Sequence, residues 1–120
     1  MARYADGFLL AVPKRKLDVY RAISRKAGKI WKEYGALEYI ECVGDDLKVK
    51  MGLSFTKVAR VKPGEVAVFS WILYKSRADR DRINRKVMKD PRLASMMDPK
   101  SMPIDMKRMA YGGFRTIVDL

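Results

Sequence analysis

Apolar runs of strand length recur along the chain and predict the strands of a β-sheet. They cover residues 4–12, 36–44, 53–61, 65–74 and 110–118. Between the third and fourth runs, KPGE at 62–65 places Pro and then Gly at the centre of a turn, which is typical of type II because Gly64 supplies a positive φ. We therefore expect 53–61 and 65–74 to form a hairpin, with 65–74 as its stronger strand.

Two other stretches show the 3.6-residue spacing of amphipathic helices. The first covers residues 13–34 and repeats apolar side chains at Leu17, Tyr20, Ile23, Ala27, Ile30, Trp31 and Tyr34. Gly28, which weakens this helix by about 1 kcal/mol relative to alanine, indicates close packing on the sheet. The second helix begins after Ser76, forms a capping box with Asp79, and stops at Asp90 before a proline.

The order of these elements is β-α-β-β-α-β with one extra hairpin arm. This is the ferredoxin-like pattern of α+β domains, an antiparallel sheet with both helices on one face. No repeat, linker or shift in composition divides the chain, so residues 1–120 are expected to form a single domain. The segment 91–106 is long for a plain connection and holds four of the eight methionines.

The strand stretches 8–12 and 66–74 are apolar on both alternations. An antiparallel sheet with helices on one face normally leaves its other face wet, and its strands then alternate. A second copy of the chain is the simplest cover for such a face, since twofold dimers are the commonest assembly. We therefore expect a homodimer in which two sheets pack face to face as a dimeric α/β barrel.

Four stretches that cover most of the chain carry a family resemblance: DGFLLAVPKRKLDVYR (6–21), AGKIWKEYGALEYIECVGDD (27–46), VFSWILYKSRADRDRINRKVMKDPRL (68–93) and MPIDMKRMAYGGF (102–114). In them the chain resembles the YbaA-like family, small uncharacterised bacterial proteins of the dimeric α/β-barrel superfamily. The resemblance implies the dimeric ferredoxin-like fold but no particular reaction. Relatives elsewhere in that superfamily include cofactor-free monooxygenases on aromatic substrates, haem-degrading enzymes and lactone isomerases, and fold alone does not choose among them.

The chain has a net charge of +12, from 26 Lys and Arg against 14 Asp and Glu. The excess concentrates in the two predicted helices: residues 14–33 hold eight basic and two acidic residues, and 75–90 hold seven and three. Either these are solvated helix faces, or they bind an anionic partner such as nucleic acid without sequence selection. An RNA-recognition module is disfavoured, because YGGF lies in the last strand and 66–74 lacks the glycine–aromatic pattern of such modules.

Composition argues against several kinds of site. With no histidine and one cysteine, the chain lacks the usual zinc and haem ligands and the usual nucleophile–base pair, so we expect no metal and no cofactor. Cys42 is expected to be a small buried apolar residue, and a chain without disulfides fits a cytoplasmic protein. No apolar run reaches the roughly 20 residues of a membrane helix, and the N-terminus shows no signal peptide.

A ligand cavity is expected between the sheet and the helices or at the dimer mouth. The candidate ligand-binding residues are two strand aromatics, two methionines of an adaptable apolar wall and one nearby cation: Tyr39, Trp71, Met102, Met106 and Arg108. The alternative is that the aromatics fill the core and the methionine segment only covers the edge of the sheet.

Acid–base chemistry would fall to carboxylates, lysines or tyrosines. Asp6, Glu38 and Glu41 lie in or beside strands, where an ionised group is costly unless it is paired. Lys107 or Arg108 could pair with one of them at the dimer seam, which is a structural role. The catalytic alternative is a carboxyl group of raised pKa that abstracts a substrate proton. The candidates for catalysis are Glu41, Arg108 and Tyr111.

The sequence and its resemblance together predict a homodimer that binds a small apolar or aromatic molecule, or catalyses a cofactor-independent reaction on it. The alternative is a non-catalytic basic module that binds nucleic acid or another anionic partner. Nothing in the residues distinguishes an enzyme from a binding protein.

Overall fold

The computed structural model describes residues 2–98 and 100–120. Within them, four antiparallel strands form one sheet in the order β2-β3-β1-β4: β1 (Tyr4–Pro13), β2 (Glu38–Val43), β3 (Glu65–Tyr74) and β4 (Ala110–Arg115). The central strands β1 and β3 pair along their whole length, with Tyr4 opposite Tyr74. This is the predicted ferredoxin-like arrangement.

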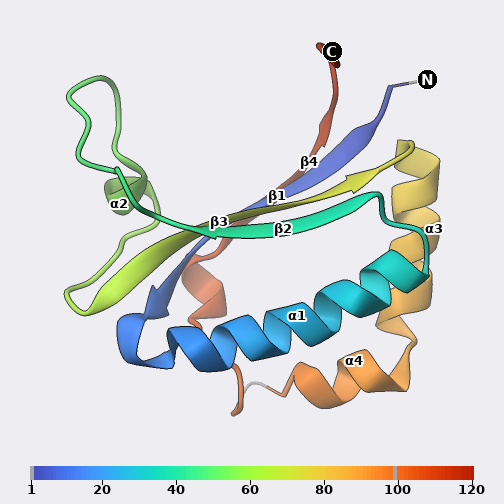
Figure 1. The fold of residues 1–120 in the computed structure, drawn as a ribbon, viewed down its shortest axis with the longest axis horizontal. Helices are drawn as coiled ribbons and strands as arrows, with labels where there is room; N and C mark the ends of the chain where they lie inside the picture. The colour runs from blue at the N-terminus through green and yellow to red at the C-terminus, as the bar shows by residue number, and fades with distance from the viewer. Residues whose placement is uncertain (1, 99) are drawn as a thin grey trace.

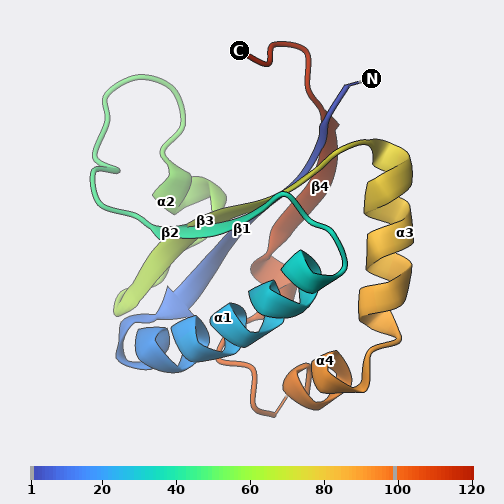
Figure 2. The same ribbon diagram turned by 45° about the vertical axis from the view of Figure 1, so that its right-hand side comes forward.

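Three helices cover one face of the sheet: α1 (Leu17–Glu33), α3 (Arg77–Met88) and α4 (Pro91–Met96) (Figure 1). We call this the helix face and the opposite side the open face. One further turn of helix, α2 (Phe55–Val58), lies beside β3 (Figure 2). The centroid of its Phe55 ring is 6.1 Å from that of Phe69 on the open face. Short 3-10 turns, Lys14–Lys16 and Met106–Arg108, lead into α1 and β4.

The core lies between the helix face and the helices, because strand alternation and helical spacing bring their apolar sides together. Its largest fully buried apolar side chains are Tyr74, Leu10, Ile30, Ile83, Val12 and Val87. They come from the two central strands and from the inward sides of α1 and α3, the elements whose periodicity is clearest in the sequence.

Caps fix the ends of the later helices. The Ser76 hydroxyl accepts a hydrogen bond from the Asp79 amide at 3.2 Å, which confirms the predicted cap of α3. Asp90 caps α4 in the same way, accepting from the Arg92 amide at 2.9 Å. The connection 91–106 therefore begins with a helix; residue 99 within it lies outside the described residues.

The predicted strand over 53–61 is wrong, and so is its hairpin with β3. Residues 55–58 form α2 instead, because the Ser54 hydroxyl caps the Lys57 amide at 3.2 Å and starts a helical turn. The edge of β3 pairs with β2, which sets Tyr39 opposite Ile72. Gly64 has the expected positive φ of 81°. The predicted turn is therefore confirmed, and only the strand predicted before it is wrong.

Gly28 brings α1 close to the sheet, as its position in the sequence predicts. A Cβ atom built on Gly28 would lie 2.5 Å from the ring of Tyr39 on β2, much closer than carbon atoms can approach. Glycine therefore sets the distance between α1 and β2.

Arg108 ties the C-terminal connection to the start of β3. Its two terminal nitrogens donate to the Glu65 carboxylate at 2.7 and 2.8 Å, and its Nε donates to Asp105 at 3.1 Å. The Arg108 and Glu65 side chains are each only 12% exposed, so water screens this bidentate ion pair weakly. Hydrogen bonds from Arg108 lower the pKa of Glu65 to about 2.

The substitution Gly28→Ala is expected to lower the free energy of unfolding by about 1–3 kcal/mol, the range of overpacked cores, although alanine is the better helix former. Denaturant titration measures the change. In a Tyr39→Ala background the same substitution is expected to stabilise, because the ring in its way is gone. A stabilising effect in the otherwise unchanged protein would contradict the close contact.

The substitution Glu65→Gln is expected to destabilise the protein at pH 7. Because the pKa of Glu65 is about 2 when folded and near 4.5 when unfolded, the ion pair stabilises above about pH 4.5 and loses that effect as the pH falls toward 2. Urea titrations should therefore show that the difference in the free energy of unfolding between Glu65→Gln and the unchanged protein decreases from pH 7 to pH 3.

Asp46→Asn, at an exposed turn position, is the matched control for Glu65→Gln. Its free energy of unfolding should equal that of the unchanged protein across the same pH range. A stability loss in Glu65→Gln that does not vary with pH would mean that Glu65 acts through packing and not through its charge.

Candidate functional site

A cavity of about 320 Å³ lies between the helix face of the sheet and the helices α1, α3 and α4. Phe8 and Leu10 of β1 and Ser70 and Ile72 of β3 line it from the sheet. The methionine-rich connection completes the wall with Met96, Met97, Met102, Met106 and Met109. Most of the lining is apolar, with polar groups at a few positions only.

Glu41 lies at the β2 side of the cavity and accepts hydrogen bonds from two tyrosines. The Tyr20 hydroxyl on α1 donates to one carboxylate oxygen, and the Tyr39 hydroxyl donates to the other at 3.4 Å. The Ser24 hydroxyl lies 3.2 Å from that of Tyr39. Burial raises the pKa of Glu41 above its ordinary value, and burial together with Glu41 raises the pKa of both tyrosines, which stay protonated donors.

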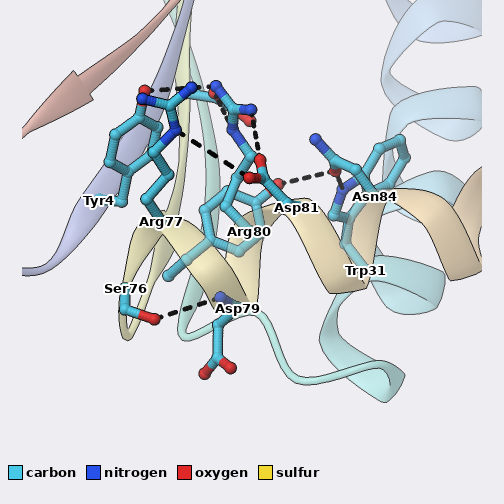
Figure 3. A network of polar contacts seen from close by, with 10 residues as sticks. Tyr4, Trp31, Ser76, Arg77, Asp79, Arg80, Asp81 and Asn84 are labelled. Atoms are coloured by element: carbon cyan, nitrogen blue, oxygen red, sulfur yellow. Dashed lines mark hydrogen bonds and ion pairs between the residues drawn. The ribbon is translucent and has the colours of Figure 1, made fainter.

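Asp6 lines the β1 side of the cavity and is 1% exposed. Arg80 of α3 donates from Nε to Asp6 at 3.1 Å and from a terminal nitrogen to Asp81 at 2.8 Å. Figure 3 shows the Arg80 guanidinium beside the ring of Tyr4, whose centroid is 4.8 Å away. Burial raises the pKa of Asp6 in spite of the attraction of Arg80, so the pair is held in a poorly hydrated site.

Gly113 on β4 leaves room for this arrangement. A Cβ atom there would collide with the Arg80 guanidinium and the Tyr4 hydroxyl. The second glycine of YGGF is thus a place where a side chain of α3 approaches the β4 backbone closely, and not part of a phosphate-binding loop.

Asn84 joins α3 to α1 and β3 at the cavity wall. Its side-chain oxygen accepts from Trp31 Nε1 at 3.0 Å and from the Tyr74 hydroxyl at 3.2 Å (Figure 3). The indole and the phenol, both largely enclosed, therefore have their polar atoms satisfied. These contacts orient Trp31 within the apolar lining.

The structure gathers most of the sequence candidates around the cavity: Tyr39, Glu41, Met102, Met106 and Tyr111 all line it. Trp71 borders it along β3, but alternation turns its indole to the open face, 5.8 Å from the ring of Phe69. There its Nε1 donates to Glu38 at 3.1 Å. Arg108 is not brought to the cavity, because Glu65 and Asp105 hold it at the end of β3.

Two further expectations are wrong. Arg108 does not pair with a strand carboxylate at Asp6, Glu38 or Glu41; Arg80 is the partner of Asp6. Cys42 is exposed rather than buried, since it lies on edge strand β2 of the single chain.

Sequence reasoning missed Arg80, Asn84 and the hydroxyl of Tyr20 as parts of the site. Tyr20 belongs to the apolar stripe of α1, so its inward direction was visible in the sequence. Its partner was not, because Glu41 comes from a strand 21 residues later. Arg80 and Asn84 sit in a strongly charged helix, where nothing local separates them from exposed neighbours.

The basic residues of the first helical region stay in solvent. All eight are exposed, and within residues 2–98 and 100–120 none of them makes an ion pair: Lys14, Arg15, Lys16, Arg21, Arg25, Lys26, Lys29 and Lys32. Binding of an anionic polymer to them stays a prediction.

The described residues hold no group of three or more His, Cys, Asp or Glu side chains suited to a metal ion. In the same part of the chain, no helix is both long enough and apolar enough to cross a membrane.

Solved structures with the same fold include a dimeric ferredoxin-like protein from an uncultured marine organism, with a TM-score of 0.62, 11% identity and 100% of both chains covered. Another is a NIPSNAP family protein with unknown function from Agrobacterium tumefaciens, with a TM-score of 0.57, 14% identity, and 96% of this chain and 87% of that chain covered. At such identities these likenesses show the fold alone.

Sequence comparison gives a nearer relationship. The chain is 44% identical over 117 residues to the uncharacterized protein YbaA of Escherichia coli K12, with 98% of each chain covered, and it matches YbaA of Shigella flexneri to the same extent. Residues 3–106 match the model of a family described as "Protein of unknown function (DUF1428)". The chain therefore belongs to the DUF1428 family.

Proposed function

We propose that this protein binds a small apolar or aromatic molecule in the cavity between the helix face and α1, α3 and α4. The observation that carries the proposal is the cavity itself: about 320 Å³, lined mostly by apolar and aromatic side chains, with a few polar groups at its margin. Ligand sites in proteins have this composition and begin at about this size. The volume favours a ligand of one or two rings.

The methionine wall supports a ligand of irregular outline. Among the described residues six methionines line the cavity, and five of them come from α4 and the connection that follows it: Met96, Met97, Met102, Met106 and Met109. Unbranched thioether side chains adjust to different shapes at little cost in energy and make favourable contacts with aromatic rings. A rigid core would not need so many of them on one side.

Glu41 is the group best placed to exchange a proton with such a ligand. It borders the cavity, and burial raises the pKa of its carboxyl group, as a general base at neutral pH requires. Asp6 is already engaged by Arg80. A cofactor-independent reaction in this cavity would therefore start at Glu41, whereas ligand binding alone needs no proton transfer.

The open face supports the second half of the proposal, a homodimer. Ile40, Phe69 and Phe114 are 37%, 46% and 64% exposed there. Alternation places all three on the side of the sheet that faces away from α1, α3 and α4. An exposed apolar sheet face of this kind marks an interaction surface. A second copy of the same face supplies the matching apolar area, and a solved protein of this fold is described as dimeric.

Binding should be lost when the cavity is filled. Ser70, 6% exposed on the cavity side of β3, offers the position for Ser70→Phe, whose ring would occupy the space of a ligand. Indole and 2-naphthol are expected to raise the thermal midpoint of the unchanged protein but not of Ser70→Phe.

Ser95→Phe, the same substitution at an exposed position of α4, is the matched control and should keep the shift. Circular dichroism checks that both variants are folded. An equal shift in Ser70→Phe, or no shift with any neutral aromatic compound, would contradict binding in this cavity.

The chain is expected to be a dimer at micromolar concentration. Light scattering should give about twice the chain mass of 13.8 kDa. Phe69→Lys places a charge in the middle of the open face and should yield a folded monomer, whereas Val19→Lys on the outer side of α1 should leave the dimer intact. A monomer mass for the unchanged protein would overturn the face-to-face dimer.

A further inference from the structure

The charge around the cavity is opposite to that of the whole protein. The chain carries a net charge of +12, with 26 Lys and Arg residues. Yet among the described residues no Lys or Arg lines the cavity, whereas two carboxylates do, Asp6 and Glu41. A cavity that collects carboxylates in so basic a protein is suited to a positively charged ligand.

The two carboxylates differ in what balances them. Asp6 has the Arg80 guanidinium at 3.1 Å, on the side away from the cavity. Glu41 accepts only from neutral hydroxyl groups, those of Tyr20 and Tyr39, and within the described part of the chain it makes no ion pair. A partly buried carboxylate without a cation is an unfavourable arrangement that a bound cation would correct.

Aromatic rings surround the space in front of Glu41. Trp31 and Tyr39 lie with their ring centroids 6.0 Å apart, and Phe8 and Tyr111 lie 5.0 Å apart at the β4 side. The negative faces of such rings attract ammonium groups, and the attraction grows when water is excluded. The same rings provide the apolar contact that an uncharged part of the ligand needs.

The sheet register sets the length of the ligand. Glu41 and Phe8 both lie opposite Ser70 in the ladder, so two strand spacings, about 10 Å between Cα atoms, separate the carboxylate from the Phe8–Tyr111 pair. Ser70 and Ile72 form the floor between them. A charged head at Glu41 and a ring near Phe8, joined by a short arm, span this distance.

We propose that the cavity is a site for an organic cation, an amine or ammonium group on an aromatic or apolar body, whose charge pairs with Glu41 while its body lies over Ser70 and Ile72. This inference rests on the proposed function and names its ligand class. No chemical step is needed, because the site only has to desolvate and hold the cation.

Other charged groups near Glu41 lie on its opposite side. Asp18, Arg21 and Arg25 of α1 line a separate groove that also reaches Glu41 and Tyr39. Arg21, Arg25 and the net charge of +12 repel a cation at long range, and salt screens that repulsion more than it screens the enclosed contact with Glu41. Cation affinity should therefore not fall as salt rises from 50 to about 300 mM.

The test uses three compounds that share one ring system: tryptamine as the cation, tryptophol as the neutral alcohol and indole-3-acetate as the anion. Calorimetry at pH 8 should give tryptamine at least about tenfold tighter binding than tryptophol, and indole-3-acetate the weakest. Lowering the pH should weaken tryptamine alone, because burial raises the pKa of Glu41 and a proton then competes with the cation.

Glu41→Gln keeps the shape of the side chain but removes its charge: the amide oxygen still accepts from one tyrosine hydroxyl, and the amide nitrogen donates to the other. It should abolish the preference for tryptamine and leave tryptophol binding within about twofold. Glu38→Gln is the matched control: it is the same substitution three residues earlier on β2, at an exposed carboxylate that holds Trp71 Nε1 on the open face. This variant should keep the preference.

Equal affinities for tryptamine and tryptophol in the unchanged protein would overturn the cation site and leave the proposed function standing. A preference that survives in Glu41→Gln would also overturn it. Failure of all three compounds, together with failure of indole and 2-naphthol, would overturn the proposed function itself. Should Glu41→Gln not fold, the pH and salt series on the unchanged protein decides the question alone.

Discussion

The site depends on the close packing of α1 against β2 at Gly28. Tyr20, Ser24 and Gly28 follow one another at four-residue spacing, so they lie on one side of α1. Because Gly28 has no side chain, the helix approaches the ring of Tyr39. That approach brings the hydroxyls of Tyr20 and Ser24 within reach of Glu41 and Tyr39. A larger residue at one position would therefore disturb the backbone distance and the polar cluster together.

Two ion-paired anchors hold the wall that closes the cavity, and the methionines lie between them. At one end, Arg92 of α4 pairs with Glu33 at the end of α1 at 2.8 Å, and Tyr34 donates to Asp90 at 2.8 Å. At the other end, Arg108 pairs with Glu65. The ends are fixed by directional contacts, whereas the lining between them is made of side chains that repack easily. The wall can thus change shape without losing its place on the sheet.

Short sequence patterns predicted the helices and strands. The errors lie where contacts between distant segments decide the structure. The periodicity of α1 and β3 and the Ser76 cap are properties of short stretches, and they predicted both elements and the fold. The stretch 53–61 was misread because Ser54 starts a helical turn and β2 takes the edge of β3, a competition between segments far apart in sequence. Tyr39 and the methionines followed from alternation and composition. The pairing of Arg80 with Asp6 could not be predicted in this way. It requires α3, β1 and β4 to come together, and no short stretch of sequence shows that contact.

Gly113 and Gly28 lie beside the two cavity carboxylates, Asp6 and Glu41, which have different roles. Gly113 admits the Arg80 guanidinium beside β4, so Asp6 is balanced by the protein itself and its pairing holds α3 on the sheet. Gly28 lets α1 approach Tyr39, and Glu41 beside it accepts hydrogen bonds only from the neutral hydroxyls of Tyr20 and Tyr39. The same packing device, a glycine facing a large side chain, thus satisfies one carboxylate with a charge and leaves the other without one. In a protein so rich in arginine and lysine, a cavity carboxylate left without a cation is better explained by binding than by structure.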